Sequence, residues 1–190
     1  MRGGRMNARS ASLLQTRRTG PIEGQPWLLL HDRYGTLDDS SALAVHSGPD
    51  ARTIAVQAPR LQTTGGLGHT HGHYWYFGAK LTPELSTLGD ALFELETLLL
   101  EIASMSRTER VGIIGGGEGG VMALLLALLW PEKLFEVVAI DAGLPHNLSD
   151  IPIEQRSLGG LKLSLINPDT DSWDTTRAVL TDIGAVLQGT

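Results

Sequence analysis

Short apolar runs alternate along this chain with segments in which apolar residues recur at helical spacing. Each run is bounded by Gly, Pro, Asp or Asn, which is typical of buried strands. The predicted strands are 27–30, 53–57, 111–114, 137–140 and 161–166. Strands separated by helical patterns indicate an α/β domain with a three-layer architecture and a mainly parallel sheet.

Three segments between and after these runs are predicted to be helices. In 87–105, leucines and an isoleucine recur at four-three-four-three spacing, whereas 119–129 is apolar all round and is expected to be covered on most sides. The third helix is predicted over 174–187. Because no internal repeat or linker interrupts this pattern, residues 21–190 are predicted to form a single domain.

Composition narrows the class of protein. The chain has 190 residues, of which 42% are apolar and none is cysteine. A chain of this length can bury a core without disulfides or a structural metal, and the lack of cysteine excludes thiol catalysis. The longest apolar run, 121–130, is far shorter than the roughly 20 residues that a membrane-spanning helix needs. We expect a cytoplasmic protein without a membrane span.

Charge is distributed unevenly. Residues 1–20 contain five arginines and no acidic residue, and they are predicted to form a disordered basic tail. The rest of the chain carries 10 of the 15 basic residues and all 21 acidic ones, so its formal charge is −11. An acidic body repels nucleic acid and anionic membranes, and we expect neither as a partner.

A glycine-rich segment, 111–125, reads as a strand, a glycine turn and a helix, an arrangement that two chemistries use. Gly115, Gly117 and Gly120 match the Gly-x-Gly-x-x-Gly pattern, with Asp141 a further 21 residues along, which would suit a nucleotide or S-adenosylmethionine at the Gly115–Gly120 loop. Gly115 to Gly119 also match the frame of a nucleophile elbow, Gly-x-Ser-x-Gly, with Gly117 at the serine position. A nucleotide-binding fold of this kind places its glycine loop after its first strand. Here 114 residues precede Gly115, which favours the second interpretation.

Several segments carry a family resemblance through their order and spacing. Residues 28–35 read Leu-Leu-Leu-His-Asp-Arg-Tyr-Gly and are followed by an Asp-Asp pair. The later segments are Ala58-Pro59-Arg60, Tyr74-Trp75-Tyr76, 130–135 followed by 137–140, and Gly143-Leu144-Pro145. Together they resemble the small carboxylesterase/phospholipase branch of the α/β-hydrolase superfamily. This resemblance implies an α/β-hydrolase-like fold over residues 27 to about 187.

The catalytic residues that the resemblance implies are incomplete in this chain. The family's serine falls on Gly117, and its acid falls on Asp171, beside Asp169. Its histidine would follow one more strand after the last helix, but no histidine comes after His146. We therefore expect a catalytically degenerate domain that is truncated at its C-terminal end, after the last helix.

Gly117 and four further residues are candidates for binding. His31 and Asp32 stand in the segment that resembles the family's oxyanion loop, with Asp32 where glycine is usual. A carboxylate there would oppose the negative charge that an oxyanion hole stabilises. Glu118 adjoins the vacant nucleophile position, and His146 is expected on the rim at the carboxyl ends of the strands.

A histidine cluster suggests a metal site. His69, His71 and His73 occupy alternate positions, so in an extended segment their imidazoles would share one face. Imidazole suits zinc, nickel or copper, and with cysteine absent a carboxylate such as Asp32 or water would complete the site. The alternative is that the cluster is exposed polar sequence.

These observations leave three hypotheses for function. The first is a hydrolase-like protein without catalysis, acting as a binding or partner subunit with another protein or as a homo-oligomer, because a sheet edge left open by truncation invites pairing. The second is an atypical esterase-like or metal-assisted hydrolase. The third is nucleotide or S-adenosylmethionine binding at the glycine loop.

Overall fold

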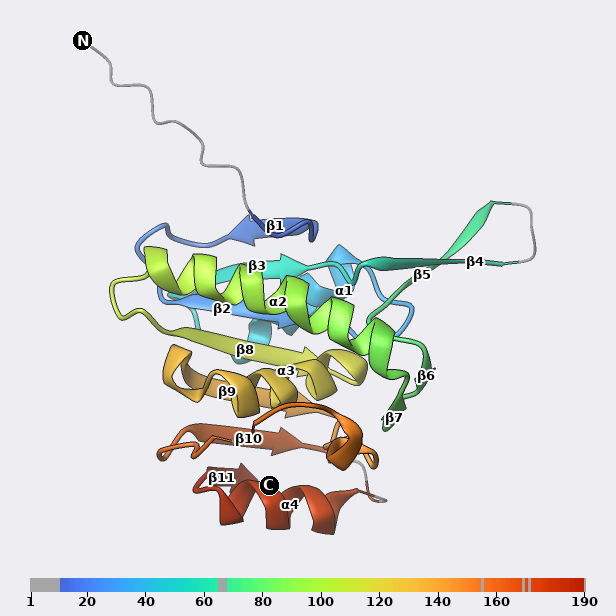
Figure 1. Ribbon diagram of the computed structural model, residues 1–190. Helices are drawn as coiled ribbons and strands as arrows, with labels where there is room; N and C mark the ends of the chain where they lie inside the picture. Colours follow the sequence, from blue (N-terminus) through green and yellow to red (C-terminus); the bar gives the residue numbers. More distant parts are fainter. Residues whose placement is uncertain (1–10, 65–67, 155, 169, 171, 190) are drawn as a thin grey trace.

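A computed structural model describes residues 11–64, 68–154, 156–168, 170 and 172–189. Its centre is a seven-stranded sheet in which every neighbouring pair is parallel except β1 and β3. In sheet order the strands are β1 (Thr16–Thr19), β3 (Arg52–Val56), β2 (Pro26–Leu30), β8 (Val111–Gly116), β9 (Leu134–Ile140), β10 (Lys162–Ile166) and β11 (Val186–Gly189) (Figure 1). All five predicted strands are confirmed, with ends that differ by at most three residues.

Helices lie on both sides of this sheet, so the predicted three layers are confirmed. One side carries α2 (Leu85–Met105), α3 (Glu118–Leu129) and α4 (Trp173–Asp182). The other side carries α1 (Leu37–Ala42) and the short 3-10 helix η1 (Leu43–His46). No helix within the described ranges combines the length and apolarity that a bilayer crossing requires.

Smaller elements connect these layers. A hairpin of β4 (Arg60–Thr64) and β5 (His69–Tyr74) projects from the domain at the carboxyl ends of the parallel strands (Figure 1). A second, shorter hairpin is formed by β6 (Gly78–Ala79) and β7 (Thr82–Pro83). Two 3-10 turns, η2 (Pro131–Lys133) and η3 (Leu148–Asp150), flank β9.

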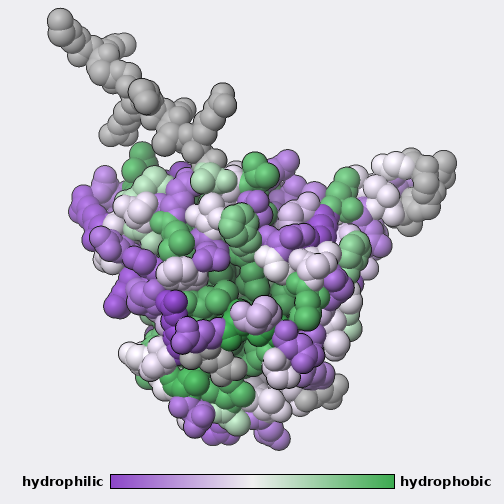
Figure 2. Space-filling model, in the orientation of Figure 1, coloured by the Kyte–Doolittle hydropathy of each residue, from purple (hydrophilic) through white to green (hydrophobic). Residues whose placement is uncertain are grey.

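The larger part of the core lies between the sheet and the helices α2 and α3. Every residue of α3 up to Leu128 is buried, which explains why its sequence has no polar face. On the face shown in Figure 2, apolar residues gather in the middle and again toward the lower left, with polar residues between and around them. The all-round apolar pattern therefore predicted a covered helix correctly.

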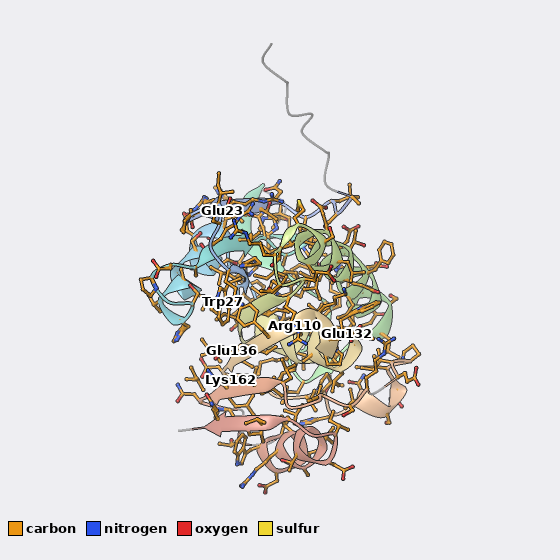
Figure 3. All side chains as sticks on the ribbon, turned by 90° about the vertical axis from the view of Figure 1, so that its left-hand side faces the viewer. Glu23, Trp27, Arg110, Glu132, Glu136 and Lys162 are labelled. Carbon is orange, nitrogen blue, oxygen red and sulfur yellow. The ribbon has the colours of Figure 1, made fainter. Side chains whose placement is uncertain are left out.

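The opposite face of the sheet is covered over only part of its width. Figure 3 looks from the amino-terminal ends of the parallel strands. It shows α1 near β2 and β3, whereas the strands beyond them have no helix on this face in the described part of the chain. There the face carries polar groups, including an ion pair of 2.7 Å between Glu136 of β9 and Lys162 of β10. Nearer α1, Trp27 packs edge-on against Phe135 at 4.9 Å between ring centroids.

The predicted basic tail is wrong from residue 11 onward. Thr16–Thr19 form β1, which pairs antiparallel with β3 at the edge of the sheet. The amide of Leu13 donates to the Glu94 carboxylate, and Arg17 forms an ion pair with Asp38. Acidic side chains elsewhere in the domain therefore bind this basic segment. The composition of the segment alone does not reveal these contacts. The tail prediction for residues 1–10 lies outside the described residues.

The predicted last helix, 174–187, is too long. It ends at Asp182, and Gly184 then adopts a left-handed φ of +90°, which ends the helical path. Val186–Gly189 form β11, parallel to β10. The strand that the sequence interpretation took as missing is present, so the prediction of truncation after the last helix is wrong. Within the described residues the edge of the sheet at this end is β11 and not β10.

Packing against Trp27 gives the first testable prediction. A Cβ on Gly112 would lie 2.3 Å from the buried Trp27 ring and 2.7 Å from the half-buried Phe135 ring, so Gly112→Ala forces both rings to move. We expect it to lower the free energy of unfolding by about 1–3 kcal/mol, as overpacked cores do. Gly116→Ala in the same strand is the control, because its nearest neighbour would be 4.0 Å away. Equal denaturation midpoints for the two variants would contradict this packing account.

Candidate functional site

The turn between β8 and α3 has the backbone of a nucleophile elbow. Gly117, at its tip, has φ +49° and ψ −116°, a conformation that L side chains rarely adopt. Its amide donates to the carbonyl of Ile140, which fixes the turn against β9. A Cβ on Gly115 would lie 2.2 Å from the carbonyl oxygen of Gly119, and one on Gly119 would lie 2.3 Å from that of Leu30. The glycine frame is therefore required for the helix to approach the sheet.

The carboxylate of Asp32 occupies the space beside this elbow. Its Oδ1 accepts a hydrogen bond of 2.8 Å from the amide of Glu118 and one of 2.7 Å from the amide of Arg33. A Cβ on Gly117 would lie 1.8 Å from the same oxygen. The amide that follows the nucleophile is a usual oxyanion-hole donor, and here an anion of the chain itself uses it.

Glu118 is fully buried and has structural partners. It forms an ion pair with Arg33, and its Oε2 accepts from the amide of Trp75 at 3.1 Å. Burial raises its pKa, while the hydrogen bond from Trp75 and the charge of Arg33 oppose that rise. Arg33 also donates to the carbonyl oxygen of Gly78 at 2.6 Å. The pair thus anchors the segment after β5 to the start of α3.

His31 is buried at the end of β2, and both of its ring nitrogens are used. Nε2 accepts from the amide of Ala58 at 2.9 Å, so Nδ1 carries the hydrogen and donates to the carbonyl oxygen of Asp32 at 2.6 Å. Burial lowers the pKa of the ring, which is therefore neutral. This imidazole fixes the Asp32 loop and has no free nitrogen for a substrate.

The remaining candidates on the rim stand apart from this cluster. His146 is exposed, on the loop after β9, and its amide donates to the carbonyl of Leu81. Asp171 and Asp169 lie outside the described residues. Their neighbour Ser172 is buried, and a Cβ on Gly143 would lie 2.0 Å from its Oγ, so the loops that follow β9 and β10 are in contact.

The three clustered histidines do not converge. In the β4–β5 hairpin, His73 is opposite Leu61 and His69 is opposite Thr64, with a bulge between them at His71. Leu61 and Thr63 share one face of β4, so Thr70, opposite Thr63, lies on the same face as His73, and the adjacent His69 lies on the other face. His73 lies 3.1 Å from the carbonyl oxygen of Ala58 through Nδ1, and the His71 ring packs on Tyr34.

No group of three His, Asp or Glu side chains in the described part of the chain could hold a metal ion. The prediction of a three-histidine site fails because it assumed an unbroken strand. The bulge at His71 reverses the alternation of side chains within five residues.

The geometry also does not favour a nucleotide at the glycine loop. A phosphate would approach the amides at the start of α3, but the Glu118 amide already faces the Asp32 carboxylate. A Cβ on Gly120 would lie 2.5 Å from that of Ala142, so this glycine serves helix packing. A second anion beside Asp32 would be repelled.

Sequence reasoning missed the contact between Asp32 and Gly117 and the pairing of Arg33 with Glu118. The sequence did contain a signal for the contact between Asp32 and Gly117. Asp32 has a side chain where the resembled family has glycine, and Gly117 lacks one where that family has serine. Such an exchange suits two positions that share one volume. The Arg33 pairing had no comparable signal, since nothing local relates residues 85 positions apart.

The sequence and the structure were each compared with those of known proteins. The sequence matches no protein-family model and no curated relative. The structure is similar to a carboxylesterase from Bacillus cereus, with a TM-score of 0.75, 18% identity, and coverage of 95% of this chain and 85% of that one. For a carboxylesterase from Mesorhizobium loti the values are 0.75, 14%, 95% and 86%, and for a phospholipase/carboxylesterase from Dyadobacter fermentans 0.73, 18%, 94% and 86%.

The chain therefore has an α/β-hydrolase-like fold, and the structures similar to it are carboxylesterases and phospholipase/carboxylesterases. This confirms the fold that the sequence segments implied. At these identities the similarity concerns the fold, because one fold hosts many activities.

The shared volume of Asp32 and Gly117 gives the second prediction. Gly117→Ser places a side chain on the Asp32 carboxylate and on a left-handed backbone, so we expect a loss of at least about 2 kcal/mol in the free energy of unfolding. In an Asp32→Ala background the backbone strain persists but the overlap is gone. The loss should shrink there by about 1–3 kcal/mol. Additive losses in this double-mutant cycle, measured by chemical denaturation, would show that the two residues do not compete for space.

The third prediction concerns the neutral ring of His31. Its folded pKa lies below the ordinary value of 6.5, so at pH values under 6.5 the unfolded chain binds a proton that the folded chain resists. Stability should therefore fall as the pH is lowered through 6.5 toward the folded pKa.

Glu118 acts in the opposite sense, because its raised pKa contributes stability at low pH that is lost as the pH rises. The difference between the wild type and His31→Gln isolates the histidine. We expect the variant to lose part of the pH dependence below 6.5, measured by denaturation at several pH values. The exposed His146→Gln should keep the wild-type dependence, and a His31→Gln curve parallel to the wild type would contradict the assignment.

Proposed function

We propose that this protein is a catalytically degenerate hydrolase-like protein that acts as a non-catalytic binding or partner subunit. One observation carries the proposal: the Asp32 carboxylate accepts the hydrogen bond of the Glu118 amide and takes the space of a side chain at position 117. The group that would stabilise an oxyanion is thus engaged by an anion that belongs to the fold.

The chemistry of acyl transfer supports this proposal. It requires a nucleophile, a base within hydrogen-bond reach and free donors for the oxyanion. Gly117 has no side chain, and the negative charge of Asp32 opposes an oxyanion at the same place. His31, the histidine nearest in sequence to that loop, has both ring nitrogens engaged.

An atypical esterase is the alternative function. Its support is the similarity of the fold to carboxylesterases, together with the retained elbow backbone at Gly117. Such an enzyme would need a nucleophile other than residue 117. A metal-assisted route through the histidine cluster has less support, since His69 and His73 project to opposite faces of their hairpin.

A partner is proposed for the end of the domain that carries the elbow. Two large side chains are exposed there, Tyr34 in the loop after β2 and Phe77 at 53% exposure after β5. The β4–β5 hairpin projects beyond them (Figure 1). Aromatic side chains are enriched at protein interfaces, so this surface suits another protein or a second copy of the chain.

The fourth prediction tests catalysis directly. The purified protein should show no fluorophosphonate labelling and no hydrolysis of a p-nitrophenyl ester above a heat-denatured control. Asp32→Gly combined with Gly117→Ser restores space and hydroxyl together but supplies no base, and it should remain inactive because triad members act as a unit. Heat-sensitive labelling of the wild type would overturn the proposal. Activity gained by the double variant would show that a base is present.

A further inference from the structure

A separate pocket lies at the amino-terminal ends of β2 and β3, at the opposite end of these strands from Gly117. Its volume is about 260 Å³, and its walls come from the loop before β2, the start of β3 and the segment in which α2 ends. Figure 3 looks onto this end of the molecule, with Glu23 labelled near the top. None of its lining residues belongs to the candidate site, so the pocket is independent of the proposed function.

The floor and part of the rim are apolar. Ile54 and Ile102 are buried at the base of the pocket. Ile22 and Met105 line it from two different elements and are 73% and 54% exposed. Large apolar side chains that line a pocket while exposed to water gain most from a ligand that covers them.

Three arginines from different elements give the pocket its charge: Arg18 of β1, Arg52 of β3 and Arg107 after α2. Arg52 is half-buried and donates a long bond of 3.5 Å to the carbonyl oxygen of Ile22. Within the described ranges no carboxylate lies within 4.0 Å of its guanidinium. Arg18 reaches Glu101 only at 4.0 Å.

Arg107 is held by Glu23 across the mouth of the pocket. The distance between the two charged groups is 2.6 Å. Because both side chains are largely exposed, the ion pair contributes little free energy and can be broken easily. Glu23 also lines the pocket. It pairs with the guanidinium of Arg107, which an entering anion could otherwise contact.

The wall beside Arg52 is already in place without a ligand. The amide of Gly24 donates to the carbonyl of Pro21, and the amide of Arg52 donates to that of Gln25. Gly24 lies so close to β3 that a Cβ there would be 2.5 Å from the carbonyl oxygen of Asp50. A ligand would therefore lose little free energy to ordering this loop.

We propose that this pocket binds a small carboxylate with an apolar body, such as an arylacetate or a branched-chain acid. The guanidinium of Arg52 matches a carboxylate in geometry and charge, and Arg18 adds to the positive potential. The apolar body lies on Ile102 and Met105. A volume of about 260 Å³, just below the usual range for ligand pockets, limits the occupant to a compact molecule.

The experiment uses phenylacetate as the probe and phenylacetamide, which has the same shape without the charge, as its control. Binding to the full chain is followed by NMR through the methyl groups of Ile102 and Met105. We expect saturable shifts with phenylacetate and much weaker ones with phenylacetamide. Equal responses to both probes, or no saturation by phenylacetate up to about 10 mM, overturn the proposal.

Two variants with opposite expected effects sharpen the test. Arg52→Gln should weaken phenylacetate binding about tenfold, the scale of one charge-assisted hydrogen bond. Glu23→Gln should tighten it, because Arg107 is released and a competing anion is removed. Arg177→Gln, which changes an exposed arginine of α4, alters the net charge as Arg52→Gln does and should leave the affinity unchanged. Wild-type affinity in Arg52→Gln, or no tightening in Glu23→Gln, also overturns the proposal.

Discussion

The hydrogen bond from the Glu118 amide to the Asp32 carboxylate joins the loop after β2 to the first turn of α3. The neighbouring contacts depend on this junction. Arg33, the next residue along that loop, reaches the Glu118 side chain, and Glu118 in turn holds the amide of Trp75. His31 fixes the same loop through the hydrogen bond of its ring to the carbonyl oxygen of Asp32. A negative charge near the start of a helix is favourable, so the junction stabilises α3 as well.

The junction lies beside an elbow backbone that has no side chain at its tip, Gly117. Gly115 and Gly119 are needed because the helix and the sheet approach too closely for any Cβ, whatever chemistry follows. Gly117 keeps the left-handed backbone at no steric cost, whereas a side chain there would be strained. The close packing at Gly115 and Gly119 is therefore a requirement of the turn itself, whatever residue stands at position 117.

The two ends of the parallel strands differ in how their polar groups are satisfied. At the carboxyl ends, the charges of Arg33 and Glu118 compensate each other, and the backbone donors beside them face Asp32. At the amino ends, Arg52 has no carboxylate partner in the described part of the chain, and an apolar pocket adjoins it. Internal compensation leaves a site rigid and closed to a further anion, whereas an unmatched guanidinium beside apolar surface favours one.

The sequence by itself determined the elements that arise from local patterning. Alternating apolar runs gave the strands of the parallel sheet, and the all-round apolar segment gave the buried α3, because side-chain periodicity follows directly from backbone geometry. The glycine frame and the absence of a serine at Gly117 were also readable from sequence alone. Local patterning failed where partners are distant: β1 depends on pairing with β3, and β11 begins where Gly184 ends a helix whose apolar spacing continued.

Only the tertiary structure decided what the candidate residues do. A single bulge at His71 sends His69 and His73 to opposite faces, which no count of spacing along the chain could show. Asp32 and Gly117 are 85 positions apart, and they share one volume only because β2 and β8 are neighbours in the sheet. Periodicity is a property of the local backbone and can be read from sequence, whereas the occupancy of a shared space depends on the relative placement of whole strands.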